Sequence, residues 1–323
     1  MIGGLVLAFT TTVAQTPADT FPLRRIEVAP AEFIAIRDVG KGQPIVIVPG
    51  LLGSAYGFRH VIPELVDAGH RVVVVDPLGT GASPAPEQAD YSLTAQSERV
   101  RAAVTELGIG RAVFVCHSTG GAICYRLALR HPGLVASILS INGGPTERLS
   151  TPGLGLALKL APILKLFGGT GRARGKVRDG LKDSSIDPSW VTDEVVAGYT
   201  AHYDGGLNRI LGTLKRMSDA REPDALAPAL PGLLTSVRLL LGRGERPGAV
   251  PADQLAALFT VPRLEVDSMP DVGQYIHEEE PAVVIAVTLE MARRAASEAP
   301  RVIAAPTLFT PVRLGTRRDT IRN

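Results

Sequence analysis

Short apolar segments recur along the first half of this chain, and their internal patterns differ. In Leu23–Val28 and Phe33–Val39 apolar and polar residues alternate, which is typical of strands with one exposed face. Pro44–Val48, Arg71–Val75 and Ala112–Val115 are apolar almost throughout. Such continuous runs predict strands that are buried on both faces.

Stretches of helical length separate the buried segments. Thr94–Leu107 and Ala122–Arg130 are predicted helices, and Val135–Ile141 is the next predicted strand. Strands that alternate with helices predict an α/β fold with a mostly parallel, doubly wound sheet covered on both faces. Because the glycine-rich loops follow predicted strands, we expect ligands at the carboxyl ends of the strands.

This alternation stops between Gly144 and about Pro231. Three helices are predicted there, over Leu154–Phe167, Thr192–His202 and Gly205–Asp219. Two more strands and a closing helix follow, over Ser236–Leu241, Arg263–Val266 and Pro281–Ala296. Residues 154–164 are apolar around most of the helix, which indicates either a buried core helix or the lining of an apolar substrate cavity. Arg172–Lys176 is predicted to be a solvated turn.

The predicted organisation is one α/β core with a helical cap inserted between its sixth and seventh strands. The expected parts are an N-terminal arm, the first part of the core, the cap, the second part of the core and a tail, at residues 1–24, 25–146, 147–231, 232–303 and 304–323. Residues 1–15 form either a secretory signal or a loose arm, so the chain is expected to be either exported or cytoplasmic. No later segment has the roughly 20 uninterrupted apolar residues of a membrane helix.

Composition narrows the expected partners. Hydrophobic residues make up 45% of the 323 positions, which is ample for a buried core. With 34 basic and 32 acidic residues the net charge is +2, and so balanced a chain does not attract nucleic acid. The expected partner is a small molecule, and the oligomeric state stays open. Cys116 and Cys124, taken as neighbours along a helix, would lie about 12 Å apart, too far for a disulfide.

The residues around Ser118 follow the order strand, tight turn, helix. Ala112–Val115 is the strand, His117–Gly121 is the turn and Ala122–Arg130 is the helix. A serine at such a corner exposes its hydroxyl above the sheet, while small neighbours let the backbones pack closely. Ser118 is therefore the candidate nucleophile. The first position of the usual G-x-S-x-G pattern is occupied by Cys116.

Four segments in this order resemble the α/β-hydrolase fold family, in the capped, esterase-like and lipase-like branch that has a serine nucleophile. They are Pro49–Leu51, Asp76–Ser83, His117–Gly121 and Gly273–Pro281. The resemblance covers about residues 25–300. It implies an α/β-hydrolase fold and chemistry that needs neither a metal nor an organic cofactor.

The same resemblance implies roles for residues in these segments. Ser118 would attack a carbonyl carbon, and the backbone N–H groups of Leu51 and Thr119 would form the oxyanion hole. Gly79 and Gly81 would shape a turn beside the site.

The resemblance implies the two catalytic partners of Ser118, the base and the acid that orients it, less directly. Glu245 stands three residues after the glycine that ends the seventh strand, the position of the acid, although it also fits a solvated loop. Gln274 occupies the usual histidine position and cannot accept and return a proton at neutral pH. His277 is the candidate base if an irregular loop turns it inward, and otherwise a surface or structural histidine. His117 is expected to point away from Ser118.

Three functions are compatible with these residues. The first is hydrolysis of a carboxylic ester or similar acyl substrate through an acyl-enzyme on Ser118. The second, favoured by Gln274, is a catalytically impaired relative that binds a small apolar ligand, and the third is a scaffold. We call the tight turn His117–Gly121 the elbow. A serine at the elbow excludes the epoxide hydrolase and haloalkane dehalogenase chemistries of related capped proteins, which attack with aspartate. A perhydrolase or a carbon–carbon hydrolase would use the same serine.

Overall fold

The computed structural model describes residues 21–51, 53–148, 170–202, 206–244, 246–298, 309–312 and 314–315. The signal-like residues 1–15, the predicted helix over 154–167 and Glu245 lie outside these ranges. Within them, no helix is both long enough and apolar enough to cross a membrane.

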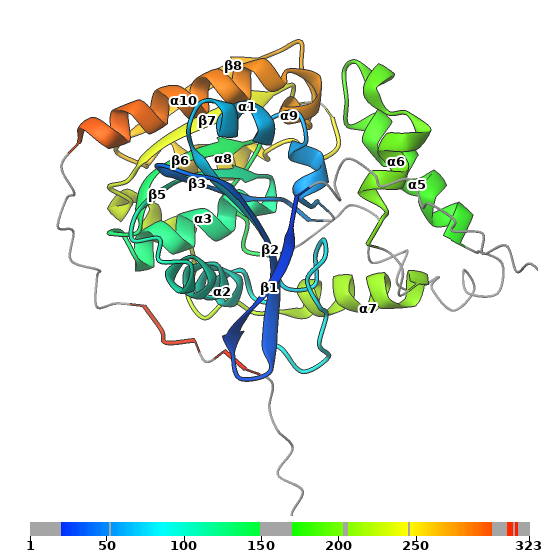
Figure 1. Cartoon of the computed structure of the whole chain (residues 1–323), viewed down its shortest axis with the longest axis horizontal. Helices are drawn as coiled ribbons and strands as arrows, with labels where there is room; N and C mark the ends of the chain where they lie inside the picture. Colours follow the sequence, from blue (N-terminus) through cyan, green and yellow to red (C-terminus); the bar gives the residue numbers. More distant parts are fainter. Residues whose placement is uncertain are drawn as a thin grey trace, which may run out of the picture.

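Eight strands form one sheet in the order β1-β2-β4-β3-β5-β6-β7-β8 (Figure 1). They are β1 (Leu23–Ala29), β2 (Glu32–Gly40), β3 (Pro44–Val48), β4 (Arg71–Asp76), β5 (Ala112–His117), β6 (Val135–Ile141), β7 (Ser236–Gly242) and β8 (Leu264–Met269). β2 runs antiparallel to β1 and β4, whereas the other neighbouring strands are parallel. The predicted mostly parallel α/β fold is confirmed.

The central strands are apolar throughout because both of their faces are covered. Along β3, Val46 and Val48 enter one hydrophobic core, whereas Ile45 and Ile47 enter the other. Successive side chains of a strand point to opposite faces, so a strand between two cores needs apolar residues at every position.

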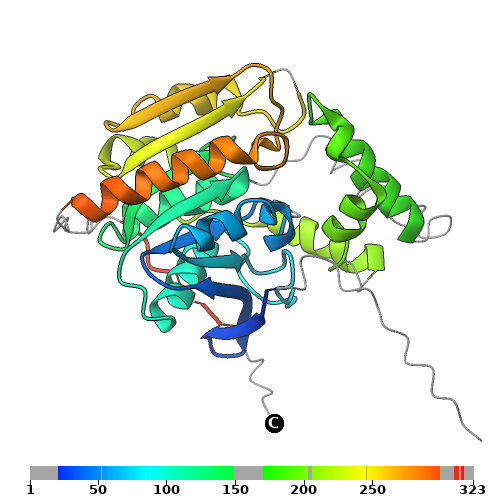
Figure 2. The same cartoon turned by 45° about the horizontal axis from the view of Figure 1, so that its top comes forward.

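Helices on each face supply the other half of each core. One face packs against α2 (Leu93–Glu106), α3 (Thr119–Arg130), α8 (Ala252–Leu258) and η4 (Ala227–Gly232). The opposite face packs against η2 (Ala55–Phe58), α1 (Ile62–Asp67), α9 (Ile276–Glu279) and α10 (Pro281–Ser297). In Figures 1 and 2 the long orange α10 lies along its face of the sheet.

Further helices lie between β6 and β7 in the chain, and we call them the helical insert. They are α5 (Thr170–Asp183), η3 (Pro188–Trp190), α6 (Asp193–Tyr199) and α7 (Gly206–Asp219). Both views show α5 and α6, in green, beyond one end of the sheet (Figures 1 and 2). The prediction of a solvated turn over Arg172–Lys176 is wrong, because these residues belong to α5. Gly175 and Gly180 weaken a helix in isolation, but packing of Leu181, which is buried, stabilises this one.

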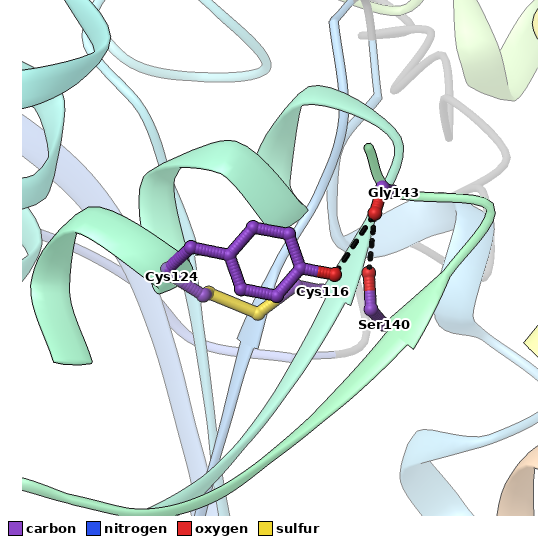
Figure 3. Close-up of a disulfide and its surroundings, with 5 residues drawn as sticks. Cys116, Cys124, Ser140 and Gly143 are labelled. Carbon is purple, nitrogen blue, oxygen red and sulfur yellow. Dashed lines mark hydrogen bonds between the residues drawn. A yellow bond between two sulfur atoms is a disulfide. The ribbon is translucent and has the colours of Figure 1, made fainter. Parts of the chain in front are cut away.

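Cys116 and Cys124 form a disulfide, which corrects the prediction that they lie too far apart. Cys116 is on β5 and Cys124 is on α3, so the chain reverses direction between them (Figure 3). Their Cα atoms are 6.8 Å apart, whereas a continuous helix would separate them by about 12 Å. The bond therefore joins the strand before Ser118 to the helix after it.

Removing this disulfide is expected to lower the free energy of unfolding by at least about 2 kcal/mol, because the short loop that it closes restricts the unfolded chain. Urea unfolding of Cys116→Ala/Cys124→Ala, compared with the oxidised wild type, measures the loss. A reductant should destabilise the wild type and leave the double variant unchanged. Equal urea midpoints for the oxidised wild type and the double variant would contradict the expectation.

Candidate active site

Ser118 sits at a strained corner between β5 and α3. Its φ is 51° and its ψ is −120°, a conformation that residues other than glycine rarely adopt. The backbone N–H of Ser118 donates to Ile141 O at 2.9 Å, and the N–H of Gly121 donates to Ser118 O at 2.9 Å. Such strain costs on the order of 1–3 kcal/mol and persists only where neighbouring structure holds it.

Two glycines allow other backbone segments to approach this corner. A Cβ on Gly120 would lie 2.3 Å from Val48 O, so only glycine lets α3 begin directly against β3. A Cβ on Gly50 would lie 3.0 Å from Ser118 Cβ and 2.9 Å from His117 O. The loop after β3 therefore passes directly beside the candidate nucleophile.

The two predicted oxyanion residues lie together beside Ser118. The backbone N–H of Leu51 donates to Thr119 Oγ1 at 2.9 Å. Leu51, Ser118 and Thr119 are each half-buried, so part of each residue stays open to solvent. The hydroxyl of Thr119 was not part of the sequence expectation, and a ligand oxygen that bound the Leu51 N–H would replace it.

The glycine-rich loop after β4 wraps around a buried carboxylate, as expected for a structural turn. Asp76 Oδ2 accepts from Ala82 N at 2.9 Å, and Gly81 has a φ of +50°. A Cβ on Gly81 would lie 2.3 Å from Asp76 Oδ2, so the turn needs glycine there. Burial raises the pKa of Asp76 to about 6, although the N–H of Ala82 and the charge of Arg37 oppose the shift.

Gln274 lies between the elbow and the loop after β7. Its carbonyl accepts from His117 Nε2 at 3.2 Å, and its side chain packs so closely on Gly248 that a Cβ there would lie 2.9 Å from Gln274 Cδ. The side chain is buried, and Oε1 has no hydrogen-bond partner in the described part of the chain. The loop that Gln274 contacts is the one that also carries Glu245, whose own position lies outside the described residues.

Asn142, which the sequence analysis missed, ties three strand ends together. Its Nδ2 donates to Gly273 O at 3.1 Å and to Gln274 O at 3.2 Å, and its Oδ1 accepts from Gly242 N at 2.9 Å. Its φ is +46°, a conformation that asparagine tolerates better than most residues. The available signal was a polar residue directly after β6, at the edge where ligands bind in such sheets.

His277 is buried on α9 in a cluster of rings. Its ring stacks on Phe58 with centroids 4.5 Å apart and meets the ring of His117 edge-on at 4.5 Å. His277 Nδ1 has no hydrogen-bond partner among the described residues. His277 is therefore buried, not on the surface, and it contacts the elbow through the ring of His117.

Both histidines are held neutral. Burial lowers the pKa of His117 to about 4, against the opposing effect of its hydrogen bond to Gln274. Burial lowers the pKa of His277 well below its usual value, and the nearby His117 and Arg59 add to the shift. At neutral pH each imidazole has one nitrogen that can accept a proton.

The buried His117 is expected to make the protein less stable in acid. Because its pKa is near 4 when folded and near 6.5 when unfolded, the unfolded chain binds more protons as the pH falls from 6.5 to 4. The resulting loss is on the order of 3 kcal/mol by pH 4. The pKa of Asp76 is raised in the folded protein, so Asp76 makes the protein more stable as the pH falls. Because Asp76 is present in both the wild type and His117→Gln, its contribution cancels when the stabilities of the two proteins are subtracted.

Urea unfolding of both proteins at pH 7, 5.5 and 4 measures this contribution. The wild type should lose about 3 kcal/mol more than His117→Gln between pH 7 and pH 4. Parallel losses in the two proteins would contradict a neutral, buried His117.

A buried ion pair joins the core to the helical insert next to these rings. Arg59 Nη1 donates to Glu278 Oε1 at 2.6 Å, and the hydroxyl of Tyr199, from α6, donates to the same oxygen at 2.7 Å. Burial raises the pKa of Glu278, and the hydrogen bond from Arg59 opposes the rise. On the next residue, the carboxylate of Glu279 accepts from Gly273 N at 3.0 Å and from Ile186 N at 3.0 Å. The segment that carries Gln274 and His277 is thus fixed to both the elbow and the insert.

Comparison with known proteins agrees with this architecture. A family model described as the alpha/beta hydrolase fold matches residues 43–173. The magnesium-chelatase 30 kDa subunit of Rhodobacter capsulatus is 31% identical over 252 residues, which span 73% of this chain and 82% of that protein. Bifunctional epoxide hydrolase 2 of Sus scrofa is 31% identical over 144 residues, 44% of this chain but only 26% of that protein.

Solved structures resemble the fold over most of the chain. The 2-hydroxy-6-oxo-6-phenylhexa-2,4-dienoate hydrolase from Rhodococcus sp. strain RHA1 superposes with a TM-score of 0.69 and 19% identity, covering 84% of this chain and 99% of that one. At this identity the likeness concerns the fold alone.

Proposed function

Since the chain belongs to the α/β-hydrolase fold family, we propose that it is a serine hydrolase that acts on a carboxylic ester or similar acyl substrate. The observation that carries the proposal is the strained backbone of Ser118, with a φ of 51° in a residue that is not glycine. Strain of this kind gathers at functional sites, because surrounding structure must hold it in place. A turn that only connected β5 to α3 could use glycine, which adopts this conformation without strain.

In the proposed reaction, Ser118 Oγ forms a bond to the carbonyl carbon of the substrate. The hydroxyl proton passes to an acceptor and then to the leaving oxygen, which departs as an alcohol. Water next attacks the acyl carbon, and one of its protons passes through the same acceptor to Ser118 Oγ as the acyl–Oγ bond breaks, so that a carboxylic acid is released and the serine hydroxyl is restored. The backbone N–H groups of Leu51 and Thr119 stabilise the oxyanion of both tetrahedral intermediates.

The identity of the proton acceptor is the next part of the proposal. His277 is the candidate: its imidazole is neutral, its Nδ1 is unpartnered in the described chain, and its ring contacts that of His117, next to Ser118. Glu245 is the proposed acid that orients the base. Stacking on Phe58 restrains the ring of His277. We therefore expect the enzyme to turn over more slowly with His277 as the base than it would with a histidine at position 274.

The similarity to epoxide hydrolases does not extend to their chemistry. Related capped proteins that open epoxides attack with an aspartate at the elbow, and this chain has a serine there. An ester bond between the enzyme and an acyl group is the intermediate that a serine can form.

A second candidate function rests on Gln274. A carboxamide cannot act as a general base, and Gln274 occupies the position between the elbow and the loop after β7. A protein with this site could bind a small apolar ligand and leave it unchanged. Tight binding with turnover that does not depend on Ser118 would support this second function.

Hydrolysis of 4-nitrophenyl acetate by the wild type, Ser118→Ala and His277→Gln separates the two functions. The proposal expects Ser118→Ala to lower kcat/KM by at least about 10-fold, and His277→Gln to lower kcat more than KM changes. Ser297→Ala, which alters an exposed serine on α10, is the matched control and should keep the wild-type rate. Equal rates in the wild type and Ser118→Ala would reject the serine hydrolase.

A further inference from the structure

The ring of Tyr275 occupies the junction between the elbow and the helical insert. Its centroid is 5.4 Å from that of His117, the residue before Ser118, and 5.5 Å from that of Trp190 on η3. Aromatic pairs interact favourably at centroid distances of about 4.5–7 Å. Rings from the core and the insert therefore form one continuous cluster that reaches His117, the residue before Ser118 in the chain.

Two members of this ring cluster remain accessible. His117, His277, Tyr56 and Tyr199 are buried, whereas Tyr275 and Trp190 are half-buried. We call Tyr275 and Trp190 the aromatic wall. Both rings therefore keep surface that a ligand can contact.

The wall is held rigidly. Trp190 Nε1 donates to Ser185 Oγ at 3.1 Å, and Tyr275 also contacts Tyr199 edge-on at 6.1 Å. Rings that are fixed before binding lose little conformational entropy when a ligand packs on them.

The surroundings of the wall favour an uncharged ligand. Arg59 and Glu278, two charged side chains that border the cluster, form a pair at 2.6 Å. Burial keeps both nearby histidines neutral. Burial, with a smaller contribution from Glu278, raises the pKa of Tyr275 to about 12, so its hydroxyl stays protonated as a hydrogen-bond donor. No hydrogen bond to the described residues engages that hydroxyl.

We propose that Tyr275 and Trp190 form a subsite for a flat, uncharged aromatic ring, so that the preferred substrates are aryl or benzyl esters. The inference rests on the proposed function for the ester, but the binding of the ring itself does not require turnover. The hydroxyl of Tyr275 can donate to an oxygen of the ligand, while the two rings pack against its face.

Trp190 allows binding to be measured without chemistry, because it is the single tryptophan of the chain. In Ser118→Ala, 4-nitrobenzyl alcohol should quench tryptophan fluorescence with saturable binding. Tyr275→Leu in the same background should weaken binding by about 3- to 10-fold, whereas Tyr275→Phe, which keeps the ring, should change it less. Absence of saturable quenching, or equal affinities for Tyr275→Leu and its parent, would overturn the subsite.

Hydrolysis of benzyl acetate and cyclohexylmethyl acetate tests the substrate preference. Benzyl alcohol and cyclohexylmethanol, the alcohol parts of these esters, are of similar size, but only the benzyl ring is flat. The wild type should prefer the benzyl ester in kcat/KM, and Tyr275→Leu and Trp190→Leu should each reduce this preference by about 3- to 10-fold. If Ser118-dependent hydrolysis occurs with no preference, the subsite fails while the proposed function stands. If quenching saturates but neither ester is hydrolysed, the proposed function fails while the subsite stands.

Discussion

Replacing Gln274 with histidine is expected to raise kcat for ester hydrolysis by about 100-fold or more. General base catalysis contributes roughly 10²- to 10⁴-fold, and the carboxamide now at this position cannot supply it. The main chain of residue 274 is already anchored, since its N–H donates to Ser184 O at 2.7 Å and its carbonyl accepts from His117. Its side chain lies against the loop after β7, where the proposed acid follows the strand.

Steady-state hydrolysis of 4-nitrophenyl acetate by the wild type and Gln274→His measures this gain. Gln274→Asn is the matched control, because it keeps an amide and should show no increase. The gain should vanish in Gln274→His/Ser118→Ala. A folded Gln274→His protein that is no faster than the wild type would show that residue 274 does not occupy the base position.

The second large effect concerns the stability of the core. Arg99 on α2 binds Glu32 through two hydrogen bonds, Nε to Oε2 at 2.8 Å and Nη2 to Oε1 at 3.0 Å. The two side chains are 1% and 0% exposed, so Arg99→Met would leave a buried carboxylate without its partner. Removing one member of such a pair costs about 3–5 kcal/mol of unfolding free energy.

Urea unfolding at pH 7 tests this expectation against a neighbour on the same helix. Arg101 pairs with Glu98 but is 37% exposed, so Arg101→Met should cost less than about 1 kcal/mol. The double variant Arg99→Met/Glu32→Leu should recover most of the loss, because an apolar pair avoids the unpaired buried charge. A cost for Arg99→Met as small as that for Arg101→Met would contradict the account.

The sheet could be predicted from the sequence because the pattern of apolar residues in each strand reflects whether one or both of its faces are buried. Pro44–Val48 and Ala112–His117 lie between two cores, and continuous apolar runs record that position directly. The tight turn at Ser118 was equally visible, since strand, small residues and helix are neighbours in the chain.

Features that depend on how distant segments meet were not visible. The disulfide forms because the chain reverses at the elbow and brings Cys116 and Cys124 together. Their spacing in the sequence does not show this reversal. The α5 helix has glycines that suggest a turn, and only its packing partners stabilise it. The burial of His277 depends on Phe58, more than two hundred residues earlier, so periodicity could not reveal it.

Covalent labelling tests the role of Ser118 most directly. After incubation of the folded wild type with a fluorophosphonate, peptide mapping by mass spectrometry should find one phosphonyl group, on Ser118. The label should be absent from urea-unfolded protein and from Ser118→Ala, and it should appear faster in Gln274→His. Folded wild-type protein that remains unlabelled at Ser118, or that carries the label on another residue, would contradict the assignment of Ser118 as the nucleophile.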